Sequence, residues 1–221
     1  MLKPDTTVSS TATARPAAPR CTAFMGARRI ASGPLPEVAE AVKVLVDRGR
    51  ASPVLVFDDE TSVVIDLDLR GTVDDVRRYA ERVVESRAAW PAAASEHEEA
   101  VPGPRGPGRP RLGVVAREVT LLPRHWEWLA TQPGGASAAL RRLVEEARRT
   151  HAGRDRVRRA QEAAYRFMSA MAGDEPGFEE ATRALFAGNR AVFEALVAPW
   201  PPDLRDHARR LAGPALSDGA L

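Results

Sequence analysis

The chain has 221 residues, of which 44% are hydrophobic and 28% are charged, and its formal net charge is +2. The one cysteine, Cys21, excludes an intramolecular disulfide framework and a cysteine-based zinc site. No segment approaches the ~18 apolar residues of a membrane span, and residues 1–20 lack the apolar stretch of a secretory signal. We therefore expect a soluble, cytoplasmic protein that makes no membrane contact.

Charge is distributed unevenly along the chain. Residues 21–103 carry 15 acidic and 10 basic side chains, whereas residues 104–150 carry 9 basic and 4 acidic side chains. A segment with a strong excess of one sign favours partners of the opposite sign. The basic middle segment is therefore the first place to look for a binding partner.

The N-terminal third predicts a disordered lead-in over residues 1–20 and an α+β domain over residues 21–90. Two strand-like pieces flank Gly26-Ala27, and apolar residues at spacings of three and four then predict a helix. Two more apolar runs flank a turn at Asp58–Thr61, and Thr72 with Asp75 predicts a capped second helix. The expected order is β-β-α-β-β-α, in one mostly antiparallel sheet with both helices on one face.

The remaining two thirds begin with a Pro/Gly-rich stretch, residues 91–113, which predicts a flexible basic linker. Residues 114–150 then predict a strand over Val114–Leu122, a short helix that begins at Pro123, and a second helix capped by Ser137. Residues 151–212 predict a small helical bundle, and residues 213–221 a tail. The expected fold class is therefore α+β throughout.

Within the linker, the run Gly108-Arg109-Pro110-Arg111 resembles the AT-hook, in which an extended Arg-Pro backbone lies in the DNA minor groove. Proline keeps such a chain extended, and arginine reaches the electronegative floor of the groove. The other interpretation is a solubilising linker, because Arg/Pro-rich stretches are common in this composition.

The strand, proline, short helix, glycine turn and second helix of residues 114–150 resemble the ribbon-helix-helix family. In that family two chains pair their strands into a ribbon that enters the major groove, so the resemblance implies a homodimer and duplex DNA as a partner. The candidate DNA contacts are Arg109, Arg111, Arg117, Thr120, Arg124 and Ser137. The candidate dimer residues are Val119, Leu121, Trp126, Leu140 and Leu143.

Strand alternation limits this interpretation. If Val119 and Leu121 face inward, then Glu118 and Thr120 face the DNA, and a carboxylate would lie among phosphates. Contacts to phosphates would still provide affinity without sequence selection. A DNA-binding, regulatory homodimer is the leading hypothesis; the alternative is a protein-interaction or assembly factor, with an unknown protein partner, that uses the same unit only to dimerise.

Taken whole, the chain also resembles a bacterial family known only as a domain of unknown function. The resemblance covers residues 21–212, and no activity comes with it. The residues that carry it include Thr22-Ala23-Phe24, Ser32-Gly33-Pro34-Leu35, Leu55-Val56-Phe57-Asp58-Asp59, Asp66-Leu67-Asp68-Leu69-Arg70-Gly71, Arg117-Glu118-Val119-Thr120-Leu121-Leu122-Pro123-Arg124-His125-Trp126, Ala164-Tyr165-Arg166-Phe167-Met168 and Phe178-Glu179-Glu180-Ala181.

Catalytic and metal-binding constellations are not evident in the sequence. Asp58, Asp59, Asp66 and Asp68 could gather at one end of a hairpin and bind a divalent cation, but aspartate is also a common turn residue. The four histidines are dispersed and lack metal-ligand spacing. We therefore expect no enzyme activity, no cofactor and no metal site. Exposed tryptophans favour interfaces, so Trp128 and Trp200 could mark partner surfaces, although such aromatics more often belong to the core.

Overall fold

The computed structural model describes residues 20–49, 52–93 and 118–217, and within these it confirms the α+β class. The expected lead-in, the expected linker except residues 91–93, and the end of the expected tail lie outside the described residues. The elements are β1 (Arg20–Met25), β2 (Arg28–Pro34), α1 (Leu35–Asp47), β3 (Val54–Asp58), α2 (Val73–Ala93), α3 (Pro123–Ala130), α4 (Gly135–Met171), α5 (Phe178–Phe186), α6 (Arg190–Val197) and α7 (Pro202–Ala212).

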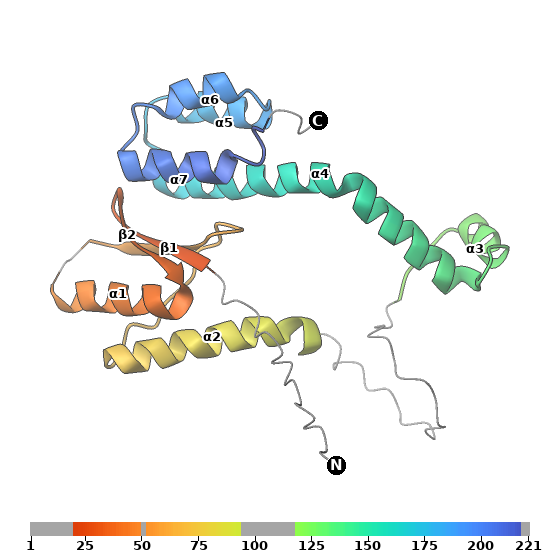
Figure 1. The fold of residues 1–221 in the computed structure, drawn as a ribbon, viewed down its shortest axis with the longest axis horizontal. Coiled ribbons are helices and arrows are strands. Elements are labelled where there is room, and N and C mark those ends of the chain that lie inside the picture. The colour runs from red at the N-terminus through yellow and green to blue at the C-terminus, as the bar shows by residue number, and fades with distance from the viewer. Residues whose placement is uncertain (1–19, 50–51, 94–117, 218–221) are drawn as a thin grey trace, which may run out of the picture.

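The three strands form one antiparallel sheet in the order β2-β1-β3, with β1 in the centre. Successive side chains of a strand point to opposite faces, and both faces of this sheet are covered. On β3, Val56 belongs to the core beneath α1, whereas Phe57 belongs to the core beneath the C-terminal helices. Figure 1 shows the sheet as a middle layer between α1 on one side and α4 and α7 on the other.

The predicted fourth strand, residues 62–67, is wrong in extent. Its pairing with β3 is limited to a single bridge between Phe57 and Val64, so the described order is β-β-α-β-α. Ser62 has a positive φ of 54° in the tight turn before the bridge. After the bridge the Ile65 amide still donates to the Val56 carbonyl of β3 at 2.7 Å. The Ile65 side chain is buried in the core beneath α1, and Leu67 and Leu69 pack against that core without belonging to a strand.

Helices α1 and α2 stack on each other rather than side by side on the sheet. The expectation that both helices pack directly on one sheet face is therefore wrong for α2, which lies on the outer side of α1 (Figure 1). Val76 and Ala80 of α2 are buried against α1, and an ion pair of 2.9 Å joins Arg77 of α2 to Glu40 of α1. The predicted capping box holds: the Asp75 carboxylate accepts from the Thr72 amide at 3.0 Å, and the Thr72 hydroxyl accepts from the Asp75 amide at 3.3 Å.

The C-terminal helices enclose an aromatic core that reaches into the sheet. Phe167 of α4 lies with its ring centroid 5.3 Å from those of both Phe24 on β1 and Phe57 on β3. Trp200 is buried, and its indole N–H donates to the Pro176 carbonyl at 2.9 Å. It is therefore a core residue and not a mark of an interface. The N-terminal sheet and the C-terminal helices, which the sequence suggests as separate units, share this core.

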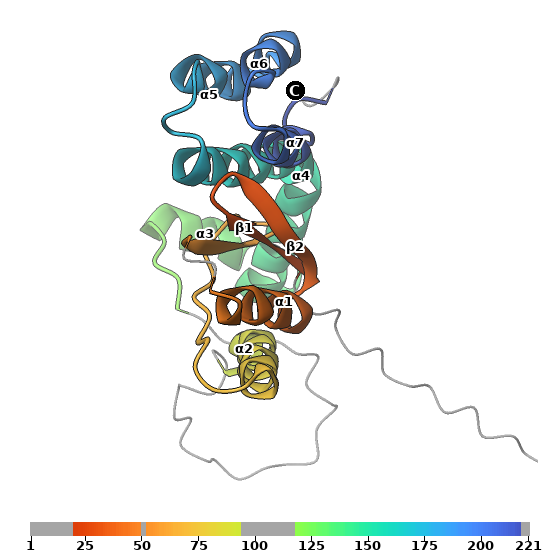
Figure 2. The same cartoon turned by 90° about the vertical axis from the view of Figure 1, so that its left-hand side faces the viewer.

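Helix α4 is a single helix of 37 residues, where the sequence suggested two helices separated near residue 150. Its interior contains no proline, and one glycine, Gly153, costs only ~1 kcal/mol in a helix interior. Apart from Ala139, its buried side chains occur in its second half, from Ala160 on, while all of residues 141–154 are exposed. The first half therefore leaves the body of the protein (Figure 1), and in the view of Figure 2 it lies behind the sheet. Among the described helices, none combines the length and the apolar character that crossing a membrane requires.

Candidate dimerisation and nucleic-acid interface

Residues 118–154, which we call the arm, comprise α3 and the exposed first half of α4. Pro123 occupies the first turn of α3, where its missing N–H costs nothing. Gly134, with a φ of 83°, takes the left-handed conformation that turns the chain from α3 into α4. The two helices pack through Leu129 and Ala139, which are 2% and 1% exposed. This contact is small, because no other side chain of residues 118–154 is buried.

Large apolar side chains of the arm are exposed in the single chain. Their exposed fractions run from 43% for Trp126 and Leu143 to 56% for Val144. The set consists of Val119, Leu122, Trp126, Trp128, Leu143 and Val144, and we call it the apolar surface of the arm. Exposed apolar surface larger than a monomer ordinarily carries is typical of a protein interface, and these six side chains are the arm's candidates for it.

The predicted dimer residues all lie on the arm. Val119, Trp126 and Leu143 belong to its apolar surface, whereas Leu121 and Leu140 are half-buried. Residues 118–122 form no strand within the single chain, and residues 114–117 of the predicted strand lie outside the described residues. Leu122 has extended backbone angles, φ −67° and ψ 150°. A ribbon strand finds its hydrogen-bond partner in a second copy, so its pairing stays a prediction.

Three of the predicted DNA contacts, Arg109, Arg111 and Arg117, lie outside the described residues. Thr120 and Arg124 are exposed on the arm, and Arg124 makes no ion pair within the described part of the chain. The prediction that Ser137 caps α4 is wrong. Helix α4 begins two residues earlier, with Gly134 as its N-cap and no side-chain cap. Ser137 instead occupies the exposed first turn of the helix.

The acidic residues of the expected second hairpin do not converge. One Asp58 oxygen accepts from the backbone amides of Glu60 and Thr61 and caps that turn, while Asp68 pairs with Arg70 at 2.6 Å. The side-chain and backbone hydrogen bonds from Arg70 lower the pKa of Asp68 to about 2. Across residues 20–49, 52–93 and 118–217, no group of three or more His, Cys, Asp or Glu residues is placed to hold a metal ion.

A partly buried polar network at the contact between sheet and helices was not foreseen from the sequence. The Thr22 hydroxyl of β1 donates to Asp59 at 2.6 Å, and Arg210 of α7 pairs with the same carboxylate at 3.2 Å. Arg210 also lies 3.2 Å from Nε2 of His207. Burial, followed by the charge of Arg210, lowers the pKa of His207 to about 4. The network joins the two halves of the chain and presents Asp59 and Arg210 at the surface.

These features define an α+β protein with a two-sided three-stranded sheet and a projecting two-helix arm. The chain belongs to the family described as "Uncharacterized protein conserved in bacteria (DUF2239)", whose model matches residues 20–212. This confirms the resemblance to a bacterial family of unknown function. No curated protein and no solved structure matches the chain. Since the family brings no activity, function has to be inferred from the geometry.

Proposed function

We propose that this protein is a DNA-binding homodimer that dimerises through the arm. The observation that carries the proposal is the apolar surface of the arm, which the single chain leaves uncovered. Fully burying a Val, Leu or Phe side chain stabilises a protein by ~1.5–3 kcal/mol, so covering the exposed half of each contributes about 1 kcal/mol. If a partner covered all six side chains, their burial would stabilise the complex by several kcal/mol. The contact between α3 and α4 does not bury them and therefore does not provide this free energy.

A second copy of this chain is the partner that best covers the apolar surface of the arm. Most of a helix's stability in a protein comes from packing of an apolar face, and residues 141–154 of α4 have no buried side chain. A two-fold partner would place the same apolar surface opposite itself, which satisfies both arms at once. In this arrangement residues 118–122 of the two chains could pair as an antiparallel ribbon.

The charge of the arm and its preceding segment supports DNA as the partner of the dimer. Residues 104–150 carry five more basic than acidic side chains, and the exposed Arg124, Arg141 and Arg142 make no ion pair among the described residues. Unpaired guanidinium groups favour phosphate, which they bind through paired hydrogen bonds. A dimer doubles this charge within one surface, so we expect affinity dominated by phosphate contacts and strongly dependent on salt.

The competing proposal, a protein-assembly factor, gains support from Glu118. This carboxylate is exposed one residue before Val119, where it would face DNA phosphates in a ribbon. Both functions require the dimer; they differ in whether the dimer then binds DNA or another protein. Replacement Glu118→Gln tests whether the strand lies against DNA: it should strengthen duplex binding several-fold if the strand lies beside phosphates, and leave it unchanged if the strand lies elsewhere.

Dimerisation is tested by sedimentation equilibrium. Wild-type protein should sediment as a dimer, and Val119→Glu or Leu143→Glu should produce monomers. The matched control is Val192→Glu on α6, because Val192 is 44% exposed but lies outside the arm. A monomeric wild type, or equal loss of dimer in the control, would contradict the arm as the interface.

DNA binding is tested by fluorescence anisotropy with a labelled duplex over a range of salt concentrations. Arg124→Gln should weaken binding. It should also reduce the slope of log affinity against log salt concentration by about one if one chain of the dimer contacts a phosphate through this residue, and by about two if both chains do. Arg28→Gln removes the same charge from the β1–β2 hairpin and should change neither quantity. A dimer that binds no duplex even at low salt would refute DNA binding and favour the assembly factor.

A further inference from the structure

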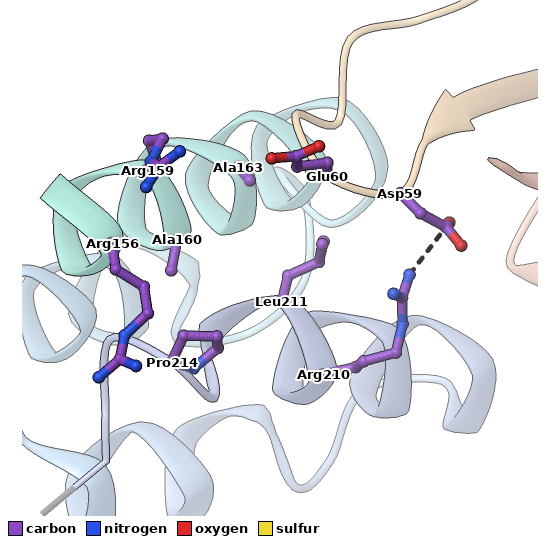
Figure 3. Close-up of a pocket in the computed structure, with 9 residues that line it drawn as sticks. All are labelled: Asp59, Glu60, Arg156, Arg159, Ala160, Ala163, Arg210, Leu211 and Pro214. Atoms are coloured by element: carbon purple, nitrogen blue, oxygen red, sulfur yellow. Dashed lines mark hydrogen bonds and ion pairs between the residues drawn. The ribbon is translucent and has the colours of Figure 1, made fainter. Parts of the chain in front are cut away.

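A cavity of about 320 Å³ lies between α4, α7 and the turn that follows β3. Its floor is made of small or apolar side chains, Ala160 and Ala163 of α4 with Leu211 of α7 (Figure 3). The two alanines explain why the cavity exists, because larger side chains at these positions would fill the gap between the helices. The volume is at the lower end of the ~300–1,000 Å³ that is typical of small-molecule sites.

Charged side chains from three separate elements surround this floor. Arg156 and Arg159 come from α4, Arg210 comes from α7, and Asp59 and Glu60 come from the turn after β3 (Figure 3). Arginines and an apolar floor together are the combination that binds an anionic group attached to a small organic body.

The charges of the cavity do not cancel. Asp59 is already satisfied, since it pairs with Arg210 at 3.2 Å and accepts from Thr22 at 2.6 Å. Arg156 makes no hydrogen bond or ion pair among the described residues, and Arg159 donates only to a carbonyl of its own helix, that of Asp155, at 3.2 Å. Two guanidinium groups without a counter-ion therefore remain against the single carboxylate of Glu60.

We propose that this cavity binds a small phosphate monoester, with its organic part on the alanine floor. Arg156 and Arg159 extend in different directions in Figure 3, but both are exposed on successive turns of α4, and we infer that they turn onto the phosphate when it binds. Guanidinium groups match the geometry of phosphate oxygens and bind them through paired hydrogen bonds. The proposal requires neither dimerisation nor DNA binding, because the side chains that line the cavity come from one chain and lie outside the arm. Failure of one proposal therefore leaves the other untouched.

Isothermal titration calorimetry with ribose 5-phosphate at low ionic strength tests the site. We expect saturable binding of one molecule per chain, and weaker binding of inorganic phosphate, which cannot use the apolar floor. The double variant Arg156→Gln/Arg159→Gln should lose about tenfold or more in affinity, as hydrogen bonds to a charged group imply. Both side chains are exposed, so the variant should fold, and an unchanged circular dichroism spectrum checks this.

Two further variants separate a built site from general attraction of anions. Arg154→Gln removes an exposed arginine of the same helix that does not line the cavity, and it should change the affinity by less than about twofold. Glu60→Gln should strengthen binding severalfold, because it removes the carboxylate that repels the ligand.

Several results would overturn the proposal. These are the absence of saturable binding, equal losses in the Arg154→Gln control and the double variant, or weaker binding by Glu60→Gln. Equal affinity for inorganic phosphate and ribose 5-phosphate would overturn the assignment of a monoester. Displacement of ribose 5-phosphate by duplex DNA, together with equal loss of duplex affinity in the double variant, would reassign the two arginines to a DNA surface.

Discussion

Acidification should destabilise this protein through His207, which is buried where β1, α4 and α7 meet. The ring is 2% exposed and lies between Phe24 and Phe167, at centroid distances of 5.1 and 4.4 Å. Burial is the largest cause that lowers the pKa of His207 to about 4, and the positive charges of Arg210 and Arg29 act in the same direction. Asp59 opposes them but does not outweigh burial. The neutral ring can accept a hydrogen bond from Arg210, whereas the imidazolium cannot.

The size of the effect follows from the difference between the folded and unfolded pKa of His207. The unfolded value is 6.5 and the folded value about 4, and at 1.36 kcal/mol per pKa unit this corresponds to about 3 kcal/mol. Between these two pH values the unfolded chain binds a proton that the folded protein excludes. The contribution of neutral His207 to the free energy of unfolding is therefore fully present above about pH 6.5. It falls as the pH decreases from about 6.5 to about 4 and does not change further below that.

Urea unfolding at fixed protein concentration, followed by tryptophan fluorescence across this pH range, measures the loss. His207→Gln keeps a polar side chain but removes the titrating group, so its free energy of unfolding should lack this fall between about pH 6.5 and 4. The matched control, His151→Gln, replaces an exposed histidine of α4 and should follow the wild type. If wild type and His207→Gln lose stability in parallel, the protonation of His207 is not the cause.

Three further predictions concern the core and its caps. Phe167→Ala should cost ~3–5 kcal/mol and, since the core is shared, urea unfolding followed by circular dichroism and by fluorescence should still show one transition; two transitions would contradict the shared core. Thr72→Ala should cost ~1 kcal/mol through loss of the cap of α2, whereas Thr72→Ser should retain it. Trp200→Phe leaves the Pro176 carbonyl without its donor and should lower the free energy of unfolding by ~1–3 kcal/mol; an unchanged urea midpoint would refute that role.

Local patterns predicted most of the elements but not their assembly. The hairpin around Gly26, the helix α1 and the capping box of Thr72 and Asp75 all depend on residues close in sequence, and the structure contains them. The short run Pro53–Phe57 is continuously apolar because both faces of β3 are buried, which fits a strand in a two-sided sheet. That pattern does not identify which helices cover the second face.

The partly buried polar network of Thr22, Asp59, His207 and Arg210 illustrates what a single sequence does not reveal. Arg210 and Asp59 are 151 residues apart, and each is unremarkable in its own segment, one on an amphipathic helix and the other in a turn. Burial is the largest cause of the low pKa of His207, and the rings packed against it, Phe24 and Phe167, belong to two other elements. Only the packing of α7 against the sheet brings these groups together, and the cavity beside Asp59 arises from the same packing.

Helix α4 links the two regions in which function is proposed. Its second half is anchored in the core by Phe167 and Met168, which are fully buried, and its first half carries the exposed Leu143 and Val144. Because α4 is one continuous helix, which bends in Figure 1 where the arm leaves the body, the arm is joined directly to the core without a loop. The cavity lies along Arg156–Ala163, directly after the arm. A dimer formed through the arm would therefore hold the two bodies apart and leave both cavities open to solvent.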